Sequence, residues 1–122
     1  MVVPHFVEGR NGDPGKLSTS AGTLAVVREG MRDTVVYGSG RRMSSLPFSS
    51  AGKTGTAQWR ADKPNHAWYT GFAPYEDPEI AVTILLEEGV EGSSAAVPVA
   101  YDILKDWWNI RQGIGTSTST ND

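Results

Sequence analysis

The sequence predicts an α+β domain in which three consecutive antiparallel strands lie between two flanking helices. Apolar residues recur every three or four positions near both ends of the chain, which is typical of amphipathic helices. Between them, two segments alternate at a period of two and a third is apolar on both faces, as strands do. The 122 residues are 39% hydrophobic and 20% charged, which suits one such domain, or a piece of one, and not several.

Both helices are predicted from the spacing of their apolar residues. The first spans about Ser20 to Asp33, with Gly30 near its expected end. The second spans about Ser94 to Ile110, and Pro98 is tolerated because it lies in the first turn. Its two adjacent stripes, which we expect to pack on the sheet, are Ala96, Ala100, Ile103 and Trp107, and Val97, Tyr101, Leu104 and Trp108. We interpret the tryptophans as packing residues.

The three strands differ in how their faces are composed. Alternation over 51–60 places Lys53 and Gly55 on one face and Thr54 and Thr56 on the other. One face of 67–73 is mostly small, which lets a helix lie close against it; its members are Ala67, Tyr69, Gly71 and Ala73. The third strand, 80–87, is apolar on both faces, which predicts a place inside a sheet covered on both sides.

The remaining segments predict loops and set limits on function. We expect an extended piece and loop over 1–16, a long connection over 38–50 and a disordered tail over 113–122. A net charge of −3 does not indicate a nucleic-acid or membrane-surface partner, and the absence of cysteine excludes disulfides and thiolate sites. No apolar run is long enough for a membrane helix, and the two histidines lack partners at metal-ligand spacing.

The densest polar cluster follows the long connection and reads Gly-Lys-Thr-Gly-Thr-Ala-Gln over 52–58. Glycines on both sides of Lys53 and Thr54 let a ligand approach the backbone, while the ammonium and hydroxyl groups suit an anion such as a carboxylate. A Walker phosphate loop is excluded, because its first glycine would fall at Pro47. The acidic residues Glu87, Glu88 and Glu91 are interpreted as a solvated loop, and Trp59 as core or rim.

The triplet Lys53-Thr54-Gly55 resembles the third signature of the penicillin-binding proteins and serine β-lactamases. Further segments are similar to the same family: Ala51 to Gln58, His66 to Tyr75, Pro78 to Val82, Glu87 to Gly89, Val27 to Met31 and Pro4 to Val7. The similarity covers nearly the whole chain except its tail. It points to class B enzymes of the elongation type, commonly called penicillin-binding protein 2, and identifies residues 1–112 as the C-terminal part of their transpeptidase domain.

The resemblance implies a serine D,D-transpeptidase that cross-links peptidoglycan stem peptides ending in D-Ala-D-Ala, is acylated by β-lactams, and uses no metal or cofactor. Lys53 would supply positive charge near the active serine, and Thr54 and Thr56 would hold the substrate carboxylate. The backbone N–H of Thr56 would be one of two oxyanion donors. Gly55 and Gln58 complete the implied substrate strand, which must be an edge because the peptide adds to it as another strand.

The family's other two signatures, Ser-x-x-Lys and Ser-x-Asn, lack credible counterparts. Ser50 to Lys53 uses the lysine of the triplet itself, and Ser119 to Asn121 lies in the predicted tail. We therefore expect the nucleophile upstream in the same domain and the chain alone to be inactive. The resemblance also implies the cell-elongation machinery as a partner, and an extracytoplasmic place on the bacterial cytoplasmic membrane, anchored by sequence absent from this chain.

Two other interpretations are open. One is a non-catalytic module that keeps the groove and binds peptide ends or a cell-wall partner; the upstream reading frame separates it from an enzyme fragment. The other, a β-lactamase piece, is disfavoured because Phe72 to Tyr75 and Glu87 to Gly89 resemble the transpeptidases more closely. In the fragment, we expect the apolar strand 80–87 to be an unprotected edge, and the isolated chain to be poorly soluble or marginally stable.

Overall fold

The computed structural model describes residues 18–114. They form one antiparallel sheet of three strands in the order β1 (Ala51–Ala57), β2 (His66–Ala73) and β3 (Ile80–Leu86). The second and third strands agree with the predicted segments to within one residue, whereas β1 ends three residues before the predicted end at position 60. The predicted α+β class is confirmed. The predicted opening loop, 1–16, and all but the start of the predicted tail, 113–122, lie outside the described residues.

The first helix, α1 (Ala21–Val36), begins where predicted and ends later. Ser20 caps it, because the Ser20 hydroxyl accepts a hydrogen bond from the Thr23 N–H at 3.0 Å. The predicted end at about Asp33 is three residues early: the helix continues to Val36, and Gly30 lies within it, where nothing crowds a Cβ. A short 3₁₀ helix, η1 (Arg41–Ser45), also interrupts the segment predicted as a continuous connection.

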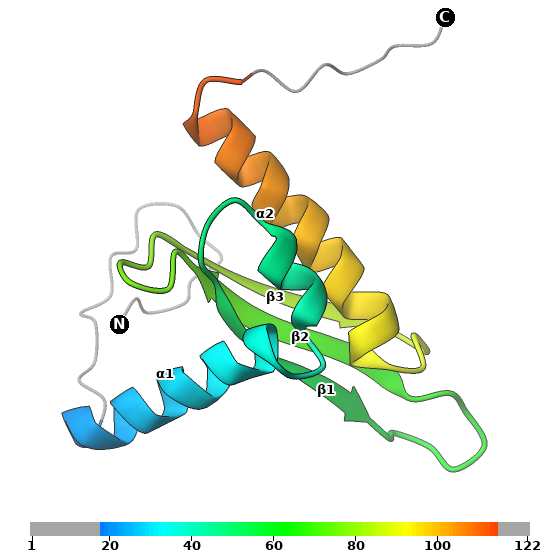
Figure 1. The fold of residues 1–122 in the computed structure, drawn as a ribbon. Coiled ribbons are helices and arrows are strands. Elements are labelled where there is room, and N and C mark those ends of the chain that lie inside the picture. Colours follow the sequence, from blue (N-terminus) through cyan, green and yellow to red (C-terminus); the bar gives the residue numbers. More distant parts are fainter. Residues whose placement is uncertain (1–17, 115–122) are drawn as a thin grey trace, which may run out of the picture.

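The C-terminal helix is preceded by a single π-helical turn, η2 (Gly92–Ala96), and then runs as α2 (Val97–Arg111). Pro98 lies in its first turn, as predicted. Figure 1 shows α2 crossing one face of the sheet. Its buried residues are Val97, Ala100 and Leu104, and Tyr101 and Trp107 pack against the same core, as predicted. Ile103 is the exception, because it is 41% exposed.

The two faces of the sheet differ sharply in burial. On the face under α2, Ala67, Tyr69 and Ala73 are fully buried, which confirms that this predominantly small face receives the helix. The β3 side chains on this face, from Ile80 to Leu86 at every second position, pack against the same core. On the opposite face, Thr83 and Leu85 are exposed, so within the described residues β3 is an edge strand with one covered face. This is the unprotected edge expected of the fragment, and the second cover predicted for this strand is absent from residues 18–114.

Two sets of contacts hold the helices to the sheet. Phe48 lies 5.7 Å from Trp107 and 4.7 Å from Trp108 between ring centroids, so the tryptophans pack as predicted and anchor the segment that leads into β1. At the other side, α1 lies beside β1 (Figure 1), and the Arg32 guanidinium donates to the Ser50 carbonyl at 2.7 Å. The start of β1 is therefore fixed from both sides. Within 18–114, no helix is long and apolar enough to cross a membrane.

Candidate active-site strand

The predicted site residues lie along β1, which is an edge of the described sheet. Between residues 18 and 114, no backbone hydrogen bond joins β1 to any strand other than β2. Register pairs Lys53 with Thr70 and Gly55 with Trp68, which places Lys53 and Gly55 on the face opposite α2. Lys53 is exposed, and its ammonium donates to the Thr54 carbonyl at 2.5 Å. The strand thus presents a cation beside a glycine at an open edge.

The two predicted hydroxyl residues lie on the other face of β1. Thr54 pairs with Tyr69 and Thr56 with Ala67, both on the α2 side. The Thr54 hydroxyl is 2.5 Å from the hydroxyl of Ser39, a hydrogen bond in which either can donate. The sequence analysis missed Ser39, since it belongs to a predicted loop and no local pattern indicates that it meets Thr54. Thr56 is exposed, and Gln58 lies just beyond the end of β1.

Gly52 has a packing role that corrects the sequence interpretation. It was expected to let a ligand approach, but it is buried, and a Cβ added there would lie 2.2 Å from the Tyr69 hydroxyl oxygen. Tyr69 is fully buried, and its hydroxyl has no hydrogen-bond partner among residues 18–114. Burial raises the pKa of Tyr69 to about 12, because the apolar surroundings disfavour the phenolate. The glycine before Lys53 therefore makes room for a core side chain.

A second glycine, Gly92 in η2, touches the same strand from the α2 side. A Cβ on Gly92 would lie 2.4 Å from the Trp68 carbonyl oxygen and 2.5 Å from that of Gly55. Only a residue without a side chain lets η2 approach the β1 backbone this closely. The sequence analysis gives Gly92 no role, so this support of Gly55 was missed.

Trp59 and His66 form a stacked pair beyond the end of β1, with ring centroids 5.1 Å apart and planes 15° apart. The Trp59 indole N–H donates to the Pro64 carbonyl at 3.1 Å, and the Glu88 N–H donates to Nδ1 of His66 at 3.1 Å. A cavity of about 450 Å³ is lined by Trp59, His66, Glu87 and Glu88. Trp59 is 46% exposed, so it lies on the rim and not in the core.

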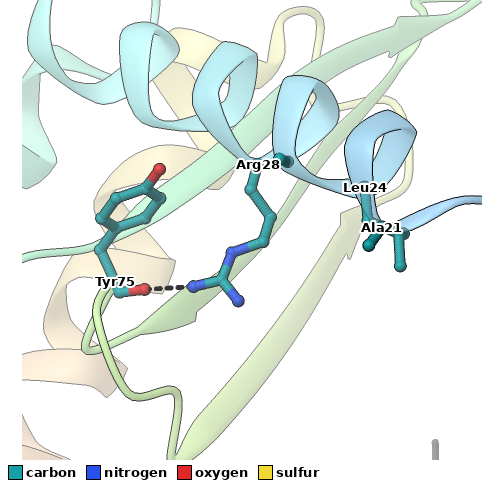
Figure 2. Close-up of a pocket in the computed structure, with 5 residues that line it drawn as sticks. Ala21, Leu24, Arg28 and Tyr75 are labelled. Atoms are coloured by element: carbon teal, nitrogen blue, oxygen red, sulfur yellow. Dashed lines mark hydrogen bonds between the residues drawn. The ribbon is translucent and has the colours of Figure 1, made fainter.

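Another cavity of about 450 Å³ lies beneath the first turns of α1, where it is lined mostly by apolar side chains and by Arg28 and Tyr75 (Figure 2). The Arg28 guanidinium donates to the Tyr75 carbonyl at 2.6 Å and lies 5.4 Å from the ring centroids of Phe72 and Tyr75. The charge of Arg28 is thus already engaged by the protein. Nearby, a hydrogen bond from the Ser49 hydroxyl lowers the pKa of the Glu76 carboxyl.

The string that imitates Ser-x-x-Lys does not present a nucleophile. Ser50 directly precedes β1, is 1% exposed, and its hydroxyl has no hydrogen-bond partner in the described part of the chain. The second string, Ser119 to Asn121, lies outside the described residues. No group of three or more potential metal ligands occurs between residues 18 and 114.

Known proteins resemble the chain in both sequence and fold. The penicillin binding protein transpeptidase domain matches residues 1–105. The peptidoglycan D,D-transpeptidase MrdA of Haemophilus influenzae is 35% identical over 101 residues, which are 69% of this chain and 16% of that protein. The structure of Pseudomonas aeruginosa PBP2 in complex with WCK 5153 matches with a TM-score of 0.70 at 29% sequence identity. The match covers 93% of this chain and 26% of the PBP2 chain. The structure of Helicobacter pylori PBP2 in complex with MreC matches with a TM-score of 0.61 at 33% sequence identity, and the match covers 71% of this chain and 17% of that one.

The chain therefore belongs to the penicillin-binding protein transpeptidase family, whose fold it carries. These relatives confirm the elongation type of class B that the sequence resembles. The chain spans only 16 to 26% of the length of these three relatives.

Proposed function

We propose that this chain is part of a serine D,D-transpeptidase that cross-links peptidoglycan stem peptides and binds β-lactams. The observation that carries the proposal is the exposed Lys53 beside Gly55 on an open edge strand of a sheet that matches this family. A serine attacks the carbonyl of the terminal D-Ala-D-Ala bond, D-alanine leaves, and an amine from a second stem peptide resolves the acyl-enzyme. Residues 1–112 belong to the transpeptidase domain, and 113–122 form its tail.

In this proposal the donor peptide adds to β1 as an antiparallel strand, and each predicted residue has a distinct role. Lys53 places positive charge near the active serine and the peptide carboxylate, and the hydroxyls of Thr54 and Thr56 help to hold that carboxylate. The N–H of Thr56 is an oxyanion donor, a fixed dipole whose loss typically lowers a rate by roughly a hundredfold or more. Gly55 and Gln58 contact the peptide backbone. The open edge of β1 supports this arrangement.

The active serine itself belongs, in this proposal, to sequence upstream of the chain. The burial of Ser50 supports this, because a hydroxyl enclosed beside β1 cannot reach a peptide on the edge. Upstream sequence also supplies the strands that pair with β3 and the membrane anchor that holds the enzyme at the extracytoplasmic face. The H. pylori PBP2 complex with MreC supports the cell-elongation machinery as a partner.

A non-catalytic module that binds peptides through the same groove is the second candidate, and the lack of an accessible serine in the Ser50 string favours it. The two candidates differ in the upstream reading frame. The enzyme requires Ser-x-x-Lys and Ser-x-Asn in the same frame before Lys53, whereas the module requires neither.

Benzylpenicillin tests the proposal. The full-length protein is expected to gain one benzylpenicilloyl group by intact mass, and Lys53→Ala to slow this acylation by roughly tenfold or more, since a charge-assisted interaction is lost. Lys105→Ala, an exposed lysine on α2, is the matched control and keeps the wild-type rate. The 122-residue chain alone gains no adduct. A full-length protein that never becomes acylated, or a chain that does so stoichiometrically by itself, contradicts the proposal.

A further inference from the structure

Ser39 reaches the proposed substrate strand from the turn that follows α1. Its hydroxyl oxygen lies 2.5 Å from that of Thr54, although the two residues are 15 positions apart in the sequence. Among residues 18–114, this is the only hydrogen bond that either side chain makes. Thr54 is one of the two residues whose hydroxyl, in the proposed function, holds the carboxylate of the peptide. A side chain that fixes the direction of the Thr54 hydroxyl therefore acts on that site.

The backbone on both sides of Ser39 is held against the end of α1. The Gly38 N–H donates to the Asp33 carbonyl at 3.1 Å, and the Gly40 N–H donates to the Thr34 carbonyl at 3.0 Å. A Cβ on Gly38 would lie 3.0 Å from the Thr34 Cα, and a Cβ on Gly40 would lie 3.2 Å from the Thr34 carbonyl oxygen. The two glycines thus let the turn lie close on the helix. Ser39 is presented to β1 from a fixed backbone.

The chemistry of the bound anion sets the direction of this hydrogen bond. An ionised carboxylate only accepts hydrogen bonds, whereas a hydroxyl has one proton to donate and lone pairs that accept. When Thr54 donates its proton to the carboxylate, its oxygen can still accept a proton, and Ser39 is the neighbour placed to donate it. Accepting that bond polarises the Thr54 hydroxyl and strengthens its own donation. In the free protein either oxygen can donate, so the anion selects one direction.

We propose that Ser39 is a positioning residue of the transpeptidase, which holds the Thr54 hydroxyl so that its proton points to the carboxylate of the peptide or β-lactam. The inference rests on the proposed function, which places that carboxylate at Thr54. Ser39 acts through Thr54 and does not itself touch the ligand. Without the Ser39 hydroxyl, the Thr54 side chain must be ordered when the anion binds, so the loss falls on ligands that carry the carboxylate.

A merely structural role for this hydrogen bond would give a different result. Ser39 is exposed and Thr54 is half-buried, so water can replace either partner. Because unfolding exchanges such a bond for bonds to water, its loss changes stability little. Ser39→Ala is therefore expected to shift the melting temperature of the full-length protein by no more than about 2 °C.

The experiment measures acylation of the full-length protein by benzylpenicillin and by its methyl ester, which keeps the reactive ring and lacks the carboxylate. Ser39→Ala is expected to lower the second-order rate constant for benzylpenicillin by about three- to tenfold, as the loss of one hydrogen bond warrants, and to leave that for the ester unchanged. Ser39→Thr keeps the hydroxyl and is expected to stay within about twofold of the wild type with both compounds. Ser44→Ala is the matched control and keeps both rates, since Ser44 is an exposed serine of η1 whose hydroxyl donates only to the Arg41 carbonyl among residues 18–114.

A double-mutant cycle connects the effect to Thr54. In Thr54→Val, where a methyl group replaces the hydroxyl, the further change Ser39→Ala is expected to have no effect, since the two residues act through one bond. The inference is overturned by acylation of Ser39→Ala at the wild-type rate, by an equal loss with the acid and the ester, or by a loss that persists in Thr54→Val. These results overturn the inference alone when benzylpenicillin acylates the wild-type protein. If the wild-type protein forms no adduct, the proposed function fails, and the inference fails with it.

Discussion

The hydroxyl of Tyr69 lies against the backbone of Gly52, so closely that a Cβ on the glycine would sit 2.2 Å from the phenolic oxygen. Gly52 is the residue directly before Lys53, and Tyr69 is fully buried under α2. The position of the exposed lysine is thus coupled to the core of the sheet through one glycine and one aromatic ring. Substitutions at this contact therefore test both the packing of the core and the position of Lys53.

Gly52→Ala is expected to lower the free energy of unfolding by about 1–3 kcal/mol, because the added methyl must displace a well-packed ring. The matched control is Gly30→Ala within α1, where a Cβ meets nothing within 4 Å. That control is expected to stabilise the protein by roughly 0.5–1 kcal/mol, since alanine favours a helix interior. Urea unfolding followed by circular dichroism measures both. Equal stability of the two variants contradicts the packing role of Gly52.

The free energy of unfolding is expected to fall at alkaline pH, where Tyr69 loses its proton. Burial raises the pKa of Tyr69 to about 12 from an ordinary value of 10.0, so the folded protein holds this proton more tightly than the unfolded chain does. The contribution of this proton to the free energy of unfolding is fully present below pH 10. It is lost as the pH rises from 10 to 12, by roughly 2–3 kcal/mol in all. Unfolding measured across this range should show the decline in the wild type and a smaller decline in Tyr69→Phe.

Tyr69→Phe also has an expected effect at neutral pH. The hydroxyl is buried without a partner in the described part of the chain, so its removal is expected to be neutral or to stabilise the protein by about 1 kcal/mol. A loss of more than about 1 kcal/mol would mean that the hydroxyl makes a bond that residues 18–114 do not supply.

Local patterns predicted much of this fold. Alternation at a period of two located β1 and β2, and an apolar run located β3, although β1 ends at Ala57, three residues before the predicted end. The spacing of apolar residues located the start of α1. These features depend on residues close in sequence. The predicted strand that carries Lys53 and its place at an edge also followed from the sequence, although the edge rested on the family resemblance and not on the residues themselves.

Features that depend on distant residues were not predictable. The bond between Ser39 and Thr54, the contact of Gly92 with Gly55, and the packing of Tyr69 on Gly52 each join segments that only the folded chain brings together. The exposed face of β3 is a similar case. Its apolar residues indicate that the strand favours apolar contacts, but they do not show whether another segment covers that face. The exposure of Ile103 is another case, because spacing along the helix does not show which of its apolar residues the sheet covers.

The exposed face and open edge of β3 predict association of the isolated chain. Leu85 is 43% exposed on this strand, so another chain can pair with it. Leu85→Lys is expected to raise the soluble fraction of the 122-residue chain, because charge on an edge strand opposes pairing. Light scattering during concentration measures this, with Val26→Lys on the exposed side of α1 as the control for added charge alone. Equal improvement in both variants would attribute the effect to net charge and not to the edge.

Gly92 offers a way to disturb the substrate strand without touching its side chains. A Cβ at this position would meet the Gly55 carbonyl at 2.5 Å and the Gly55 nitrogen at 3.0 Å, so Gly92→Ala must push η2 away or shift β1. A shift moves the adjacent Thr56 N–H, the proposed oxyanion donor. We therefore expect acylation of the full-length protein by benzylpenicillin to slow by roughly tenfold or more, because oxyanion stabilisation depends on the placement of its donors. Stopped-flow measurement below the melting temperature of both variants, with Gly30→Ala as the matched control, separates this effect from unfolding. Acylation of Gly92→Ala at the wild-type rate would mean that η2 yields without moving β1.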